Sequence, residues 1–195
     1  MAKVQILSKE TSELIAAGEV IERPSSIVKE LIENSIDSGA TAITVEIKHG
    51  GISYLRVTDN GCGIDYEDVP TAFLRHATSK IRNKSDLDSI LTLGFRGEAL
   101  ASICAVAKVD VLTKTSDEQF GTHYTINGGV EKEYDQTGCP DGTTIIIRDI
   151  FYNVPARLKF LKKDVYKTSF KYLYVISLLI KIFSNMKLTF LLLCT

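Results

Sequence analysis

A carboxylate and a carboxamide stand one helical turn apart in residues 26–38, and side chains of these types can take part in phosphate chemistry. At about 100° per residue, Glu30, Asn34 and Asp37 fall within about 60° of one another, opposite an apolar half. A glutamate can take a proton from an attacking water, and an asparagine oxygen can ligate Mg²⁺. Phosphoryl transfer to water needs both functions close together. An ordinary amphipathic helix with a solvated polar face gives the same pattern.

Two glycine-containing segments could bring backbone close to a ligand. In residues 59–63 the Asp59 carboxylate can accept a hydrogen bond from an exocyclic amine such as that of adenine, and Gly61 and Gly63 allow positive φ and close approach. The same residue types also form common turns. Residues 94–100 place two glycines before an expected helix, where free backbone N–H groups favour phosphate. The chain contains no Walker A or Rossmann glycine pattern.

Two weaker candidates lie elsewhere in the chain. Lys80 could reach a phosphate from the polar stretch 77–97, which we expect to be mobile. Thr143, in the segment 142–144, could reach a base through water. On residue type alone, Lys80 could equally belong to a solvated loop, and Thr143 could simply begin a strand.

Apolar periodicity and turn residues define the expected elements. Helices are predicted over residues 8–18, 24–38, 65–76 and 98–107, and strands over 43–47, 54–58, 108–114, 121–127 and 143–149. At the start of the second helix, Pro24 is expected to lie in the first turn and a serine to be the cap residue. Most strands are joined by short turns, which favours an α+β fold: a two-layer sandwich of one mixed, mostly antiparallel sheet with helices on one face.

Composition sets wide limits. The 195 residues are 45% hydrophobic and carry a net charge of −1, which suits one domain and favours neither nucleic acid nor membrane. Residues 157–171 hold six basic side chains against one acid, and form either a DNA-binding patch or a solvated helix face. The four cysteines lack zinc spacing and the start lacks a leader, so we expect free thiols in a reducing cytoplasm or nucleus.

The apolar segment 172–193 has two interpretations. Its length would allow a membrane span. Lys181, Asn185 and Lys187 interrupt it, which is costly in lipid, so a helix up to about Ser184 and a strand over 187–193 are favoured.

The order of these signals resembles a known ATP-binding signature. Glu30 and Asn34, then 59–63, 94–100 and 142–144, resemble the GHKL superfamily, which contains DNA gyrase, the large heat-shock chaperone, histidine kinases and MutL. Within that group the chain is similar to the MutL family of DNA mismatch repair proteins. The segments that carry this similarity span about residues 4–163 and are 15–24, 30–40, 75–81, 94–100 and 151–157.

The resemblance implies a GHKL (Bergerat) ATPase domain over residues 1–163, with a divergent helix and strand over 164–195 that complete or truncate it. It implies that Glu30 is the general base and that Asn34 holds Mg²⁺. Asp59 would read the adenine amine, with support from Thr143, and Gly61 and Gly63 would let backbone pass under the base. The remaining ATP-binding positions form the lid and phosphate site: Lys80, Gly94, Phe95, Arg96, Gly97, Glu98, Ala99 and Leu100.

The resemblance also implies partners. ATP-bound copies, or a copy and a MutL-type paralogue, would pair through the N-terminal arm up to about Val20. The switch would engage a MutS-type mismatch-recognition protein and, weakly and without sequence preference, DNA, but no membrane. The family's ATPase region normally continues into a second domain that supplies a lysine to the γ-phosphate, whereas this sequence ends at Thr195. A nucleotide-binding module without useful turnover, another GHKL enzyme and a nucleotide-independent DNA-binding fragment are the alternatives.

Overall fold

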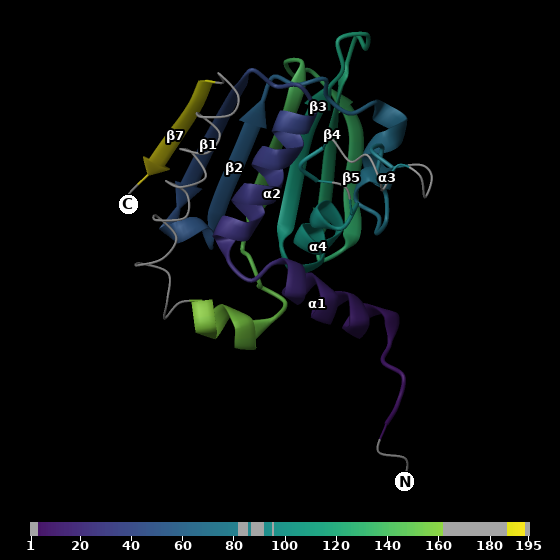
Figure 1. The fold of residues 1–195 in the computed structure, drawn as a ribbon, viewed down its shortest axis with the longest axis vertical. Coiled ribbons are helices and arrows are strands. Elements are labelled where there is room, and N and C mark those ends of the chain that lie inside the picture. The colour runs from purple at the N-terminus through teal and green to yellow at the C-terminus, as the bar shows by residue number, and fades with distance from the viewer. Residues whose placement is uncertain (1–3, 82–85, 87–91, 95, 162–186, 194–195) are drawn as a thin grey trace.

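The computed structural model describes residues 4–81, 86, 92–94, 96–161 and 187–193, and the fold is drawn in Figure 1. Its labelled helices are α1 (Lys9–Val20), α2 (Pro24–Asp37), α3 (Val69–Ala72) and α4 (Ala99–Val106), with short 3-10 turns η1 (His49–Gly51) and η2 (Tyr66–Asp68), and residues 155–161 are also helical. Its strands are β1 (Ala42–Lys48), β2 (Tyr54–Asp59), β3 (Lys108–Lys114), β4 (Gly121–Asn127), β5 (Val130–Thr137), β6 (Gly142–Arg148) and β7 (Lys187–Leu193).

The strands of the described residues form one sheet in the order β5-β4-β3-β6-β2-β1-β7. Every neighbouring pair is antiparallel except β1 and β7, which run parallel. Helices α2 and α4 lie on the same face of this sheet (Figure 1). The predicted two-layer α+β architecture with a mixed, mostly antiparallel sheet is therefore confirmed.

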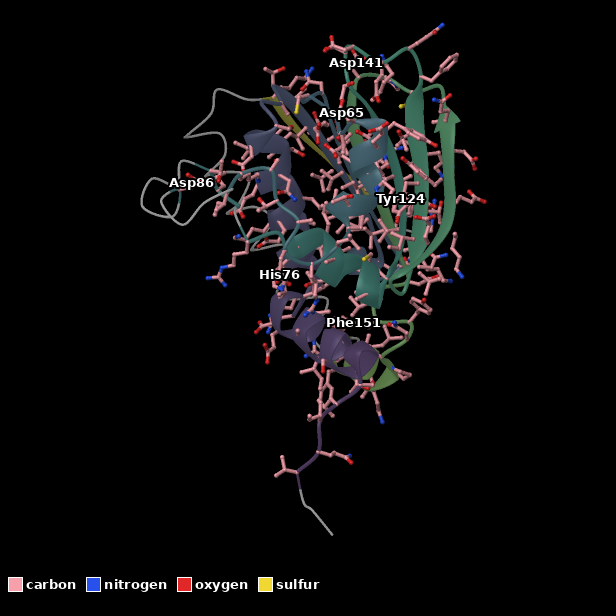
Figure 2. All side chains as sticks on the ribbon, turned by 90° about the vertical axis from the view of Figure 1, so that its right-hand side faces the viewer. Asp65, His76, Asp86, Tyr124, Asp141 and Phe151 are labelled. Carbon is pink, nitrogen blue, oxygen red and sulfur yellow. The ribbon has the colours of Figure 1, made fainter. Side chains whose placement is uncertain are left out.

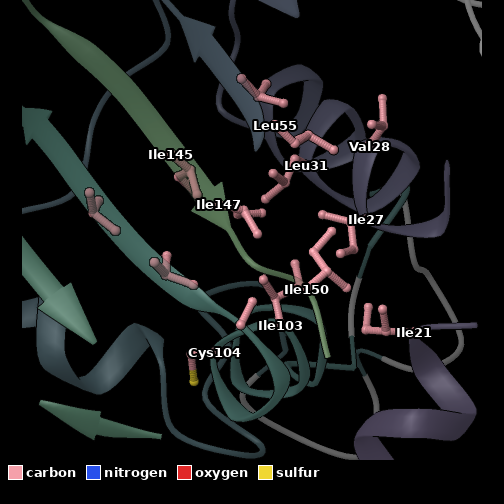
Figure 3. Packing of buried hydrophobic residues seen from close by; sticks show 14 of the residues in the cluster. Ile21, Ile27, Val28, Leu31, Leu55, Ile103, Cys104, Ile145, Ile147 and Ile150 are labelled. Carbon is pink, nitrogen blue, oxygen red and sulfur yellow. The ribbon is translucent and has the colours of Figure 1, made fainter. Parts of the chain in front are cut away.

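Helix α2 crosses the centre of the sheet with its apolar side inward. Pro24 fits the first turn, and Ile27, Val28 and Leu31 are buried. Figure 3 shows Leu31 next to Leu55 on β2 and Ile147 on β6, and Ile27 next to Ile150. Because the period of a helix is 3.6 residues, burial of this side leaves the polar side of α2 free to form a site.

Several sequence predictions of elements were wrong in detail. The helix expected over 65–76 is only η2 and α3, and His76 adopts a positive φ of 63° beyond them. The N-cap of α2 is Arg23, without a side-chain cap, instead of a serine. The strand β5 was missed, because it is a polar edge strand with little alternation, paired to β4 after the turn at Gly128 and Gly129.

The last described segment confirms the strand predicted over 187–193. It is β7, in which Leu188 pairs with Ile43 of β1 and packs against the core. The helix predicted up to Ser184 and the boundary predicted at 163/164 lie outside the described residues. Among the residues that the structure describes, no helix has the length and apolarity to cross a bilayer.

Candidate active site

Asp37, near the end of α2, binds a loop that is distant in the sequence. Its Oδ1 accepts a hydrogen bond from the backbone N–H of Leu93 at 3.0 Å, and its Oδ2 from that of Gly94 at 3.1 Å. Oδ2 also accepts from Lys80 Nζ at 2.5 Å. Burial by itself would raise the pKa of the Asp37 carboxyl, but these three donors outweigh burial and lower the pKa below its usual 3.8.

Asn34 lies one turn earlier on the same face and shares the lysine. Lys80 Nζ donates to Asn34 Oδ1 at 3.3 Å. The Cβ position of Gly94 is 3.6 Å from that same oxygen and 3.5 Å from Nζ. The structure thus brings together three predicted site residues, Asn34, Lys80 and Gly94, around Asp37.

A second group of predicted residues gathers at the end of β2, around Asp59. Its Oδ2 accepts from the Ser35 hydroxyl at 2.7 Å, and its Oδ1 accepts from the backbone N–H groups of Gly61 at 2.9 Å and Thr143 at 3.3 Å. A carboxylate offers about four acceptor positions, two on each oxygen. The protein fills both on Oδ1 and one on Oδ2, so a single position remains for a ligand donor.

The glycines near Asp59 are required by the packing of the loop. A Cβ at Gly63, where φ is +74°, would overlap the carbonyl oxygen of Lys114, and a Cβ at Gly61 would overlap the Ser38 hydroxyl. A Cβ at Gly142, where φ is +107°, would overlap the backbone of Asp59. These contacts hold the Asp59 loop between α2, β3 and β6, while passage of the backbone under a base remains a prediction.

The 75–81 and 94–100 segments meet ahead of α4. The backbone N–H of His76 donates to the carbonyl of Gly97 at 3.0 Å, and a Cβ at Gly97, φ +61°, would overlap the backbone of Ala77. Glu98 is the N-cap residue of α4, and its Oε1 lies 2.7 Å from His76 Nδ1. Figure 2 shows His76 beside α4 on this side of the molecule.

The other predicted lid positions have different outcomes. Ala99 and Leu100 form the first turn of α4, where free N–H groups were expected. Arg96 is exposed. Phe95 lies outside the described residues.

Glu30, the predicted general base, is on α2 one turn before Asn34. Its Oε1 is 3.2 Å from the ammonium of Lys29, which also binds Glu33 Oε2 at 2.7 Å. The described contacts of Glu30 are therefore with its own helix and not with the glycine loops.

Sequence reasoning missed two residues that organise the site. Asp37 was placed on the polar face of α2 but given no role, although its position three residues after Asn34 was a usable signal. Ser35 is 3% exposed and orients Asp59. It had no signal, because a serine in a helix usually bonds its own backbone, as Ser35 also does with the carbonyl of Leu31.

The oxygens on this face are of the kind that Mg²⁺ prefers. The described residues contain no cluster of three His, Cys, Asp or Glu side chains able to hold a metal alone. Mg²⁺ usually takes one or two protein oxygens and completes its shell with water and phosphate. Asn34 Oδ1, with the Asp37 carboxylate beside the same ammonium, supplies that limited set.

Comparison with known proteins identifies the family of the chain. Residues 22–141, more than half of the chain, match the family described as histidine kinase-, DNA gyrase B- and HSP90-like ATPases. The chain belongs to this ATPase family, and its mixed sheet with one helical face is the family's GHKL fold.

Within that family the chain is a MutL-type ATPase domain. It is 62% identical over 162 residues to the DNA mismatch repair protein MutL of Agathobacter rectalis, covering 83% of this chain and 25% of that protein. It is 57% identical to MutL of Caldanaerobacter subterraneus subsp. tengcongensis, covering 84% and 28%. The chain thus spans about a quarter of the length of these curated relatives.

Solved structures give the same assignment. The N-terminal domain of a DNA repair protein superposes with a TM-score of 0.78 at 33% identity, covering 93% of this chain and 52% of that one. The ADP complex of the Aquifex aeolicus MutL ATPase domain superposes with a TM-score of 0.66 at 31% identity, covering 89% and 61%.

Proposed function

We propose that this chain binds ATP with Mg²⁺ and hydrolyses it slowly, as the nucleotide switch of a MutL-type mismatch repair protein. The observation that carries the proposal is the position of α2. One helix contacts the Asp59 loop through Ser35 and the 93–94 loop through Asp37, so the groups suited to a base and to phosphates share one scaffold. The ADP bound by the structurally similar Aquifex aeolicus domain supports a nucleotide as the ligand.

Each side chain has a definite task in this proposal. The open acceptor position on Asp59 Oδ2 binds the exocyclic amine of adenine, and Lys80 with the N–H-rich 94–100 segment binds phosphate. Mg²⁺, held by Asn34 Oδ1, would neutralise phosphate charge. Glu30 accepts the proton of the attacking water.

Single-turnover hydrolysis with radiolabelled ATP and Mg²⁺ tests the assignment of Glu30. We expect Glu30→Ala to keep the affinity for ATP within about threefold and to lower the hydrolysis rate at least about 100-fold, the usual contribution of a general base. Glu33→Ala is the matched control, because Glu33 follows Glu30 by about one helical turn on α2 and also pairs with Lys29. It should retain the wild-type rate.

The outcomes separate the alternatives. A wild-type chain that binds ATP but shows no Glu30-dependent turnover would be a nucleotide-binding module and not an enzyme on its own. Equal loss of ATP binding in Glu30→Ala would contradict the role of a base. DNA affinity that falls steeply with salt and ignores ATP would favour the DNA-binding alternative.

The N-terminal arm supports a role in pairing with a second copy or a paralogue. Residues 4–8 have no regular secondary structure and precede α1, and Val4, Ile6 and Leu7 are exposed, with Val4 at 88% and Ile6 at 101%. Figure 1 shows this segment leading away from the sheet. Exposed apolar side chains of this kind are typical of a protein interface. Coupling to a MutS-type protein and to DNA belongs to the same proposal.

A further inference from the structure

The ammonium group of Lys80 occupies the place of a bound cation on the polar face of α2. Nζ bridges Asp37 Oδ2 at 2.5 Å and Asn34 Oδ1 at 3.3 Å. The Lys80 and Asp37 side chains are 20% and 6% exposed, so water screens this pair poorly. The two oxygens that hold it are the hard ligands that a divalent cation prefers.

The carboxylate that holds Lys80 is itself fixed from two sides. The backbone N–H groups of Leu93 and Gly94 each donate to one oxygen of Asp37. Rotation of the carboxylate would therefore break two backbone hydrogen bonds as well as the ion pair. A constrained acceptor of this kind defines one position for the ammonium.

This inference rests on the proposed function and adds a control on cation binding. We propose that Asp37 is a positioning residue that holds Lys80 on Asn34 Oδ1, so that this oxygen is blocked to a divalent cation until a triphosphate draws the ammonium away. An oxygen that accepts from an ammonium cannot also ligate a dication at about 2.1 Å, because the two positive charges would lie within contact distance. Lys80 must leave Asn34 before that oxygen can act as a ligand.

Binding of Mn²⁺ to the nucleotide-free chain, followed by electron paramagnetic resonance of the free ion, tests the proposal. Mn²⁺ is suitable because it accepts the same oxygen ligands as Mg²⁺. We expect Lys80→Met to bind Mn²⁺ at least about tenfold more tightly than wild type, because a repelling charge is gone and two oxygens are freed. Lys80→Gln is a second variant in case the methionine variant does not fold.

A control variant shows whether the effect depends on where the positive charge is removed or only on the loss of one positive charge. Lys108→Met removes the same charge from another lysine–aspartate pair, in which Lys108 Nζ lies 2.8 Å from Asp149 Oδ2. It should bind Mn²⁺ as weakly as wild type. Adding Asp37→Asn to Lys80→Met should abolish the gain, because the anionic ligand is lost.

A folded Lys80 variant that binds Mn²⁺ no better than wild type would overturn the proposal, as would an equal gain in Lys108→Met. Failure of the proposed function has a different signature, because it appears as absent ATP binding or absent Glu30-dependent hydrolysis in the wild-type chain. The Mn²⁺ measurement contains no nucleotide and therefore separates the two results.

Discussion

At the scale of single residues, the hydrogen bonds of Asp59 determine which purine the site prefers. In Asp59→Asn, the amide oxygen must take the Oδ1 position, because the N–H groups of Gly61 and Thr143 point there. The amide nitrogen then takes the Oδ2 position, where the open acceptor was, and presents a donor. We expect the binding free energy of ATP to weaken by about 1–3 kcal/mol. The preference should shift towards GTP, because guanine presents a carbonyl that can accept from the new donor.

Competition of ATP and GTP for the chain measures this change. Asp65→Asn is the control, since it removes the same charge from an exposed position after the same loop, labelled in Figure 2. An unchanged ratio of ATP to GTP affinity in Asp59→Asn would disprove the assignment of Asp59 as the base-reading residue.

The site was only partly predictable at this scale. Asn34, Lys80, Gly94 and Asp59 could be proposed from residue type, from the wheel of α2 and from the resemblance. Their partners could not, because the bonds of Asp37 to residues 80, 93 and 94 join positions more than 40 apart in the sequence. Only the folded chain brings such positions together.

At the scale of elements, the junction of α1 with residues 149–157, a turn followed by the start of a helix, is the feature that local sequence explains least. Arg157 Nη1 donates to the carbonyl of Gly18 at 2.5 Å and to that of Ile21 at 3.4 Å, and the guanidinium lies 5.5 Å from the ring centroid of Phe151. Phe151 is buried at a positive φ of 62°, and Figure 2 shows it next to α1. The first residue of the predicted basic patch therefore binds the end of a helix.

Gly18 was expected to end α1, yet the helix continues to Val20. The position instead leaves room for Arg157, since a Cβ there would overlap the guanidinium. We expect Gly18→Ala to lower the free energy of unfolding by about 1 kcal/mol, because the displaced guanidinium loses charge-assisted hydrogen bonds. In an Arg157→Ala background the same change should instead stabilise by about 0.5–1 kcal/mol, the normal helix preference for alanine.

Urea unfolding of the four proteins in this double-mutant cycle measures the coupling. The sign of the effect of Gly18→Ala is the decisive result. If Gly18→Ala stabilises the chain to the same extent with and without Arg157, the guanidinium does not constrain α1.

At the scale of the whole molecule, the sheet joins the first and the last strand of the described chain. Strand β7 adds to the edge of β1 in parallel, and its residues alternate between the two faces of the sheet. The strand was predictable from its apolar run. Its parallel partner was not, because sequence pattern contains no strand order, and a parallel pair needs a long connection that local turn signals do not describe.

The same alternation makes the contribution of β7 measurable. Leu188 pairs with Ile43 and packs against the core beneath the helices, whereas Leu191, at odd spacing from it, is 44% exposed. We expect Leu188→Ser to lower the free energy of unfolding by about 1–3 kcal/mol, and Leu191→Ser by less than about 0.5 kcal/mol, in chemical denaturation. Two equal and small effects would show that β7 does not complete the sheet in solution. Because β1 leads directly from α2, a loss at Leu188 that also weakened ATP binding would connect this edge of the sheet to the site.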